Sequence, residues 1–286
     1  MIIDESLVRS MTPDRPDDGH KGTFGTALIV AGSEFMSGAQ VLATSACLNS
    51  GVGMVRVLAP EVSYAGTRVN CPCAMLSPYP DNVEALLREA SEFLVKTKAV
   101  LIGPGIDVDD KRSYALLWFF IQNAPALVID ASALALLAKY QEELLPLLRQ
   151  RTANGLSQAV LTPHIGEMRR LSNDTSVDAV KAWAKKNNCV VVLKNAETNI
   201  ITPAEEVYTN IVTNSGMAKG GSGDVLSGLM TGLLAQGITA VSSAVSAVFF
   251  HSLAGGIAAS DIGKRAMLPT DIIDNLSYAY ETVGWK

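Results

Sequence analysis

Short apolar runs alternate along this chain with longer segments in which apolar positions recur every three or four residues. The runs are rich in β-branched residues, are bounded by Gly, Pro or a charge, and are too short to be buried helices. Because nearly every position in them is apolar, they predict strands of a parallel sheet that is covered on both faces. The runs occupy residues 27–30, 55–58, 99–102, 127–129, 159–161 and 190–193.

Helical spacing fills the segments between these strands and predicts helices at residues 38–50, 82–94, 111–122, 132–148 and 177–187. Strands and helices in alternation give a mostly parallel central sheet with helices on both faces, which is a three-layer α/β fold. Residues 199–202 and 207–209, separated by a Pro-containing tetrapeptide, predict a hairpin at the edge of the sheet. The rest of the chain is predicted to be helical.

One segment without any acid, Lys or Arg runs from residue 225 to residue 260 and is long enough to cross a membrane. It is interrupted by Gly232, Gly237 and His251, among others, and it lacks aromatic or basic anchors at both ends. We therefore expect two buried helices joined near residues 236–238, with His251 in the core, and no membrane as a partner.

Composition places the chain among folded proteins. Hydrophobic residues make up 48% of the 286 positions and charged residues 18%, which supplies enough apolar surface for one large core. We expect a single domain over residues 1–286, in which residues 1–20 pack loosely. Four scattered cysteines and an N-terminus without a signal peptide favour the cytoplasm. The net charge of −5, without a basic run, argues against nucleic acid as a partner.

Glycines and polar residues follow several of the predicted strands directly. In open α/β sheets, ligands bind beyond the carboxyl ends of the strands. Five strand ends continue into such residues, and because these ends share one edge of the sheet, they predict a cleft there. The residues at these ends include Gly32, Gly105, Asp130, His164 and Lys194.

Two of these side chains, and one loop, have alternative interpretations. His164 precedes a helix start and lies three residues before Glu167, so it either contacts a substrate or caps the helix. No third ligand accompanies the pair, which argues against zinc. Lys194 either neutralises a nucleotide phosphate or is a surface lysine with a buried stem. The loop at residues 21–25 (KGTFG) either folds over a ligand or is a flexible entry to the first strand.

The strongest local signal is a glycine cluster that opens directly into a helix, within residues 214–228 (NSGMAKGGSGDVLSG). Backbone N–H groups at the positive end of the helix dipole form a site for phosphate or for a developing oxyanion. The cluster lacks the Gly-Lys-Ser/Thr ending of a P-loop and the preceding strand of a dinucleotide fingerprint. Asp224 in the first turn is either a dipole partner or, as we prefer, a base that accepts a proton from an attacking hydroxyl.

Six motifs occur along the chain in the order KGTFG, SGAQ, IGPG, LTPHIGE, LKNAET and GMAKGGSGDVLSG. Their order and spacing resemble those of the ADP-dependent NAD(P)H-hydrate dehydratases, a branch of the ribokinase-like superfamily. The resemblance extends from about Lys21 to Gly237 and implies the three-layer ribokinase-like fold. It is closest to the stand-alone form of the enzyme, which carries no epimerase domain.

This resemblance implies the repair of nicotinamide cofactors that carry water at C6 of the ring, (6S)-NADHX and (6S)-NADPHX. ADP phosphorylates the 6-hydroxyl, and elimination of phosphate then restores NADH or NADPH and leaves AMP. Carried over by position, the residues that contact the hydrated cofactor are Ala39, Gly105, His164 and Asp224. Those of the nucleotide site are Lys194, Asn195, Ala196, Glu197, Thr198 and Gly223.

Under the same resemblance Asp224 is the catalytic base, and the N–H groups of Gly221, Ser222 and Gly223 hold the charge on the transferring phosphoryl group. A divalent ion, Mg²⁺, is implied to bridge nucleotide oxygens while it keeps several waters, with no metal-ligating residue to name. The implied partners are the hydrated cofactor and ADP. The likeness also implies a homo-oligomer, namely a homotetramer.

Three positions depart from the family's usual pattern. Asn195 replaces a Gly, which puts in doubt a close approach of the nucleotide to the backbone there. Ser222 replaces a Thr and keeps the hydroxyl. Ser132 replaces the second Asp of an Asp-Ala-Asp sequence, so Asp130 remains a site candidate without an assigned role.

Two other functions share parts of this pattern. An ATP-dependent ribokinase-like kinase of a hydroxyethylthiazole or hydroxymethylpyrimidine alcohol uses the same glycines and acid, although LTPHIGE favours the dehydratase. A non-catalytic nucleotide sensor binds adenylate without any need for Asp224. The sequence does not distinguish NADHX from NADPHX, and the preference for ADP over ATP is inherited from the resemblance.

Overall fold

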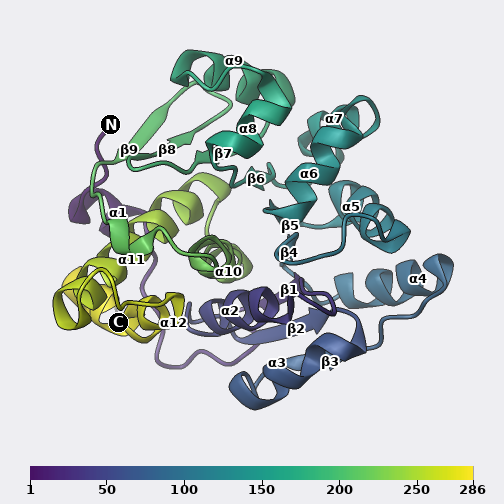
Figure 1. Ribbon diagram of the computed structural model, residues 1–286, viewed down its shortest axis with the longest axis horizontal. Helices are drawn as coiled ribbons and strands as arrows, with labels where there is room; N and C mark the ends of the chain where they lie inside the picture. Colours follow the sequence, from purple (N-terminus) through teal and green to yellow (C-terminus); the bar gives the residue numbers. More distant parts are fainter. Residues whose placement is uncertain (286) are drawn as a thin grey trace.

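A nine-stranded sheet forms the centre of the computed structural model, which describes residues 1–285 (Figure 1). The strands lie in the order β3-β2-β1-β4-β5-β6-β7-β8-β9, parallel from β3 to β7 and antiparallel from β7 to β9. The predicted α/β class and the edge hairpin are therefore confirmed. The strands are β1 (Thr26–Val30), β2 (Met54–Leu58), β3 (Met75–Ser77), β4 (Ala99–Ile102), β5 (Ala126–Ile129), β6 (Val160–Leu161), β7 (Val190–Leu193), β8 (Thr198–Ile201) and β9 (Val207–Asn210).

Helices cover both faces of the sheet, because successive strand residues point to opposite sides and most of them are apolar. Ile29 belongs to the core on one face, and Leu28 belongs to the core on the other. The first face carries α1 (Glu5–Met11), α2 (Ser37–Leu48), α3 (Tyr64–Asn70), α10 (Ser222–Ala235), α11 (Ala240–Ile262), α12 (Pro269–Asp274) and α13 (Leu276–Thr282). The second carries α4 (Val83–Leu94), α5 (Lys111–Asn123), α6 (Ser132–Lys139), α7 (Gln141–Gln150), α8 (Ile165–Ser172) and α9 (Val177–Asn187).

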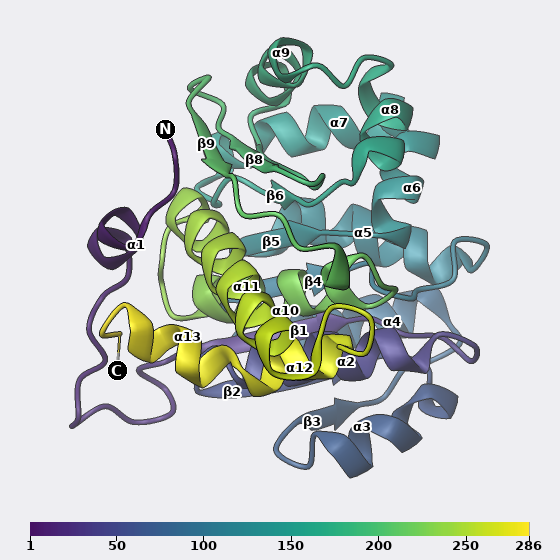
Figure 2. The same cartoon turned by 60° about the vertical axis from the view of Figure 1, so that its left-hand side comes forward.

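The apolar helices α10 and α11 lie against each other on the first face (Figure 2). By length and composition α11 is able to cross a membrane, but 67% of its most apolar stretch is buried inside the protein. It packs against α10 and α13 and against strands β7, β8 and β9. The prediction of two buried helices joined near residues 236–238 is confirmed.

The predicted helix at residues 132–148 is wrong as a single element, since the chain breaks at Tyr140 into α6 and α7. The Tyr140 ring packs against Tyr114 of α5, with ring centroids 4.6 Å apart. Glu142 and Glu143 then begin α7 at the positive end of its dipole. Apolar periodicity continues across such a break, so the sequence pattern does not reveal it.

The start of the chain contacts the rest of the protein at a few positions. The N–H of Ile3 donates to the carbonyl oxygen of Thr209 in β9 (3.0 Å), and Val8 of α1 is fully buried. Asp4 caps α1 by accepting a hydrogen bond from the N–H of Leu7. Ile3, Val8 and Thr12 are thus buried, while the other residues of this segment are exposed or half-buried.

The loop at residues 21–25 lies at the amino end of the strands, away from the predicted cleft. A Cβ on Gly25 would lie 1.9 Å from the carbonyl oxygen of Ala235, the last residue of α10. Because α10 begins at the cleft and ends beside this loop, the loop does not cover a ligand in the cleft. Of the two interpretations, the entry to β1 is the one that the structure supports.

Candidate active site

The carboxyl ends of the parallel strands are tied together at one edge of the sheet. The N–H of Gly32 after β1 donates to the carbonyl oxygen of Pro104 after β4 (2.7 Å). The N–H of Lys194 after β7 donates to the carbonyl oxygen of Pro163 after β6 (2.8 Å). The residues that we predicted at strand ends therefore share this edge, where α10 also begins.

The glycine cluster forms a tight turn into α10. Gly221 is the N-cap residue and has φ +99°, and a Cβ at this position would lie 2.5 Å from Leu42 Cδ1 of α2. Both the backbone angle and the close approach require glycine. Within residues 1–285, no side chain caps this end of the helix. The N–H of Ser222 donates to the carbonyl oxygen of Lys219 (3.3 Å), but those of Gly221 and Gly223 remain available to an anion.

A cavity of about 850 Å³ opens beside this turn, which is a size typical of small-molecule sites. Glu197 is exposed and does not line it. The segment from Asn214 to Lys219, which leads into the glycine cluster, forms one wall. The sequence did not indicate the other walls, which come from Asn210, Val212, Thr213, Lys264 and part of α11. The cavity is also lined by five of the six predicted nucleotide residues, Lys194, Asn195, Ala196, Thr198 and Gly223.

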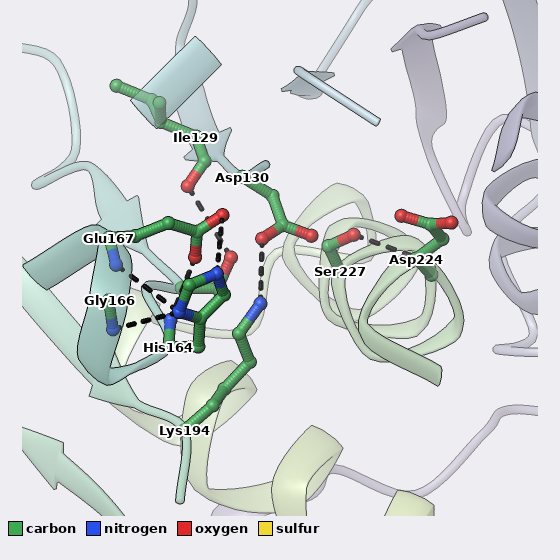
Figure 3. Close-up of polar contacts among 9 residues, drawn as sticks. Ile129, Asp130, His164, Gly166, Glu167, Lys194, Asp224 and Ser227 are labelled. Carbon is green, nitrogen blue, oxygen red and sulfur yellow. Dashed lines mark hydrogen bonds and ion pairs between the residues drawn. The ribbon is translucent and has the colours of Figure 1, made fainter. Parts of the chain in front are cut away.

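Lys194 is held inside the site rather than on the surface. Its Nζ lies 3.0 Å from Asp130 Oδ1, and Asp130 is only 1% exposed (Figure 3). Burial alone would lower the pKa of Lys194, but the carboxylates of Asp130, Glu167 and Asp224 outweigh burial and raise this pKa. The ammonium therefore stays charged. The surface interpretation of Lys194 is wrong, and Asp130 acquires a role as its partner.

His164 is the N-cap residue of α8. Its Nδ1 accepts hydrogen bonds from the N–H groups of Gly166 (2.9 Å) and Glu167 (3.2 Å), and Glu167 Oε2 accepts one from the N–H of His164 (2.8 Å). Because Nδ1 accepts, the proton of the neutral ring sits on Nε2. The ring is also 60% exposed and lines the cavity. His164 thus caps the helix, as one alternative expected, and its ring borders the cavity.

Asp224 lies on a different side of α10 from this cavity. Figure 3 shows its carboxylate across the helix from His164 and Lys194. Asp224 shares a helix face with Gly221 and Gly228, which are three and four residues away. That face is turned to α2, because a Cβ on Gly228 would lie 2.2 Å from a main-chain oxygen of α2.

The electrostatic surroundings of Asp224 favour a proton acceptor that works near neutral pH. Burial, followed by the charges of Asp130 and Glu167, raises the pKa of Asp224 to about 7, although Lys194 acts in the opposite direction. The same burial raises the pKa of Glu167. A general base is most effective when its pKa lies near the working pH. Perturbed carboxylates of this kind gather at functional sites.

Ala39 and Gly105 lie together on the α2 side of the site. Gly105 has φ +66°, and a Cβ on it would lie 3.0 Å from the Cβ of Ala39. Ala39 belongs to α2, the helix toward which the Asp224 face of α10 is turned. The start of α10 thus separates two regions, one with Ala39, Gly105 and Asp224 and the other with the cavity. His164, the remaining predicted substrate contact, belongs to the cavity.

Sequence reasoning missed the part that α11 plays in the site. His251 is 8% exposed, as expected of a core residue, but it also lines the cavity together with Ser252 and Ser222. Burial lowers the pKa of His251 to about 4, so the ring is neutral at physiological pH. Within the described chain, His251 Nε2, Ser252 Oγ and Ser222 Oγ have no hydrogen-bond partner. The sequence feature that could have indicated this role is the position of His251 within an otherwise apolar helix.

A family model described as NAD(P)H-hydrate dehydratase matches residues 27–277. The ADP-dependent (S)-NAD(P)H-hydrate dehydratase of Listeria monocytogenes is 31% identical over 92% of this chain and 90% of its own length. The bifunctional NAD(P)H-hydrate repair enzyme Nnr of Moorella thermoacetica is 34% identical over 97% of this chain and 53% of its own length. The chain thus spans about half the length of that bifunctional relative.

Solved structures share the fold. A ribokinase-like superfamily protein from Enterococcus faecalis has a TM-score of 0.83 at 26% identity, with 100% of this chain and 96% of that chain covered. The ADP/ATP-dependent NAD(P)H-hydrate dehydratase of Bacillus subtilis, co-crystallised with ATP and Mg²⁺, has a TM-score of 0.79 at 26% identity, with 98% and 97% covered. The predicted ribokinase-like fold is confirmed.

Proposed function

The chain belongs to the NAD(P)H-hydrate dehydratase family, and we propose that it repairs hydrated nicotinamide cofactors in an ADP-dependent reaction. In this reaction (6S)-NADHX or (6S)-NADPHX is converted to NADH or NADPH, and ADP is converted to AMP and phosphate. One observation carries the proposal. Asp224, with its pKa near 7, stands at the junction between the uncapped glycine turn and the region that holds Ala39 and Gly105.

Two steps account for this chemistry. The oxygen of the 6-hydroxyl attacks the β-phosphorus of ADP, and the bond from that phosphorus to the bridging oxygen breaks, so that AMP leaves. Asp224 accepts the hydroxyl proton, while the N–H groups of Gly221 and Gly223 hold charge on the transferring group. The N–H of Ser222, which we expected to share this role, donates instead to the carbonyl oxygen of Lys219 (3.3 Å). In the second step the C6–O bond breaks and phosphate departs. Loss of a proton from C5 then re-forms the ring double bond.

The cavity supports a nucleotide on the other side of the turn. The ammonium of Lys194 borders this cavity close to the start of α10, since a Cβ on Gly223 would lie 3.3 Å from Nζ. A charged donor and helix N–H groups together are well suited to phosphate. Asn195, Ala196 and Thr198 continue the wall and would contact the rest of the adenylate.

Mg²⁺ fits this arrangement as an ion held through nucleotide oxygens. Within residues 1–285, no three His, Cys, Asp or Glu side chains converge on a common point. Asp130 Oδ2 has no hydrogen-bond partner in that range and is able to accept a hydrogen bond from a water of the ion. When bound, Mg²⁺ would neutralise phosphate charge. The chain itself contributes Lys194 and the start of α10 to the same task.

We further propose that the chain acts in the cytoplasm as one domain and as a homotetramer. One continuous sheet through the described residues supports the single domain. Exposed apolar side chains such as Val62, Val69 and Leu268 offer surface for self-association. Light scattering on the purified protein gives the molecular mass in solution, and the mass of a monomer would exclude the tetramer.

A direct assay tests the dehydratase function. The protein is incubated with hydrated NADH, Mg²⁺ and either ADP or ATP, and NADH absorbance, AMP and phosphate are followed. We expect equal amounts of NADH, AMP and phosphate with ADP. Asp224→Asn serves as the control, and we expect it to retain nucleotide binding while turnover falls by several orders of magnitude.

Two other outcomes would replace the proposal. ATP-dependent phosphorylation of a hydroxyethylthiazole or hydroxymethylpyrimidine alcohol, without recovery of NADH, would identify a kinase. Adenylate binding with no turnover of either kind of substrate would identify a nucleotide sensor.

A further inference from the structure

The side chain of Lys219 is fastened to the main chain of a distant segment. Its Nζ donates to the carbonyl oxygens of Arg265 (2.8 Å) and Met267 (2.6 Å), which lie in the connection between α11 and α12. Two short hydrogen bonds fix the end of a side chain that otherwise has many rotamers. Lys219 is therefore held in one place before any ligand arrives.

Lys219 also belongs to the turn that starts α10. Its carbonyl oxygen accepts a hydrogen bond from the N–H of Ser222 (3.3 Å). The residue lines the cavity that also contains Gly223 and Lys194. Lys219 thus lies at the wall of the cavity, two residues before the N-cap of the helix.

The charge of Lys219 is not balanced by an acid. Lys194 forms an ion pair with Asp130, whereas Lys219 forms none within residues 1–285. Its two partners are neutral carbonyl groups. An ammonium group has three donors, so one N–H of Lys219 remains uncommitted.

Fastening the turn does not by itself require a charge, because other contacts already hold it. Asn214 Nδ2 donates to the carbonyl oxygen of Gly255 (2.8 Å). Gly216 is packed so closely that a Cβ on it would lie 2.3 Å from Met267 Sδ. The positive charge of Lys219 therefore needs another explanation.

A buried hydroxyl beside the turn independently indicates a ligand. Ser222 is 7% exposed and lines the same cavity, and its Oγ has no hydrogen-bond partner within the described residues. A buried hydroxyl without a partner is costly unless a ligand or water satisfies it. Hydroxyl, free helix N–H groups and an unbalanced ammonium together match a phosphate group.

We propose that Lys219 binds the terminal phosphate of the nucleotide, the group that is transferred, through its uncommitted N–H. This inference rests on the nucleotide site of the proposed function and adds a residue to it. A charged donor to phosphate is stronger than a neutral one. Because the side chain is already fixed, little of its entropy is lost when the nucleotide binds.

Equilibrium binding of ADP and of AMP tests this proposal. Calorimetry is carried out on the unchanged protein, on Lys219→Met and on Lys219→Gln, which keeps polar groups and lacks the charge. We expect both variants to bind ADP about tenfold or more weakly, as for loss of a charged hydrogen bond, and AMP within about twofold of the unchanged protein. Lys186→Met is the matched control, because it removes an exposed lysine of α9 that does not line the cavity.

Each remaining outcome has a definite meaning. Equal losses for ADP and AMP, or loss in Lys219→Met alone, would show that Lys219 only fastens the turn. Unchanged ADP affinity, or an equal loss in Lys186→Met, would also overturn the proposal. These binding measurements need no hydrated cofactor. If the protein prefers ADP over AMP in a way that depends on Lys219 but has no dehydratase activity, the proposed function is refuted and this inference stands. Absence of any nucleotide binding would overturn both.

Discussion

Lys194 Nζ lies 3.0 Å from Asp130 Oδ1, and this contact joins the end of β7 to the end of β5 across the intervening strand β6. The pair is buried at the edge of the sheet where α10 begins. It brings a carboxylate close enough to raise the pKa of Asp224. Asp130 therefore influences the proposed base through its charge.

Asp130→Asn is expected to shift the pH dependence of activity. Asp224 is active in its ionised form, so kcat/KM should rise with pH through a value near 7 in the unchanged protein. Removing the charge of Asp130 lowers the pKa of Asp224, so the acid limb should move to lower pH. Asp109→Asn, in an exposed loop, is the control. An acid limb that stays in place in Asp130→Asn would show that this charge does not act on the base.

Gly223→Ala is expected to weaken ADP binding without unfolding the protein. The added Cβ would lie 3.3 Å from Lys194 Nζ, the flexible end of a side chain, and it would occupy part of the nucleotide cavity. We expect KM for ADP to rise roughly 10- to 100-fold, since small misplacements at an active site have effects of this size. Gly220→Ala is the matched control, because its Cβ would meet nothing within 4 Å. Equal KM values for the two variants would place the nucleotide elsewhere.

The sequence predicted the edge of the sheet at which the site forms. It did not predict which side chains at that edge form ion pairs. Wholly apolar runs identified the parallel strands, and parallel strands carry their carboxyl ends to one edge. That rule alone brings Asp130, His164 and Lys194 to the same edge. It does not say which side chains touch, so the pair of Asp130 and Lys194 emerged only from the structure.

Packing between helices accounts for what the sequence pattern missed. An apolar segment identifies α11 as a buried helix but does not tell which neighbour each face meets. His251 therefore looked like a core residue, although α11 lies against α10 and brings the ring to the cavity. The break at Tyr140 was hidden for the same reason, since contact with Tyr114 of another helix accompanies it.

Two substitutions of His164 separate its role as a helix cap from contact with a ligand. His164→Ala removes the acceptor for the N–H groups of Gly166 and Glu167, so the free energy of unfolding should fall by about 1 kcal/mol. His164→Asn keeps a good capping residue and should restore most of this stability. If the ring also contacts a ligand, KM for ADP or for the hydrated cofactor should rise in both variants. Normal KM values in His164→Asn would restrict this residue to capping.

Asp224→Asn is expected to stabilise the protein at alkaline pH while it abolishes turnover. The carboxyl has a pKa of about 7 in the folded protein, against 3.8 without the protein's influence, so the folded state binds this proton more tightly than the unfolded chain. The free energy of unfolding therefore falls as pH rises from about 4 to about 7, because the folded protein then holds an ionised carboxylate that is buried near the negative charges of Asp130 and Glu167. Asparagine carries no charge and avoids this loss.

The difference in free energy of unfolding between Asp224→Asn and the unchanged protein should thus depend on pH. Near pH 4 the two should unfold at similar temperatures, and at pH 8 the variant should be more stable by an amount on the order of 2 kcal/mol, after allowance for partial exposure of the group. For a chain of this length that is a rise in Tm of roughly 5 °C, measurable by calorimetry.

Asp178→Asn, whose side chain is 97% exposed on α9, is the control and should show no such trend. Greater stability of Asp224→Asn at pH 8 would mean that the ionised Asp224 carboxylate costs stability, as is common for residues that are retained for function. A variant no more stable than the unchanged protein at pH 8 would mean that the Asp224 carboxylate is well solvated and is not tuned as a base.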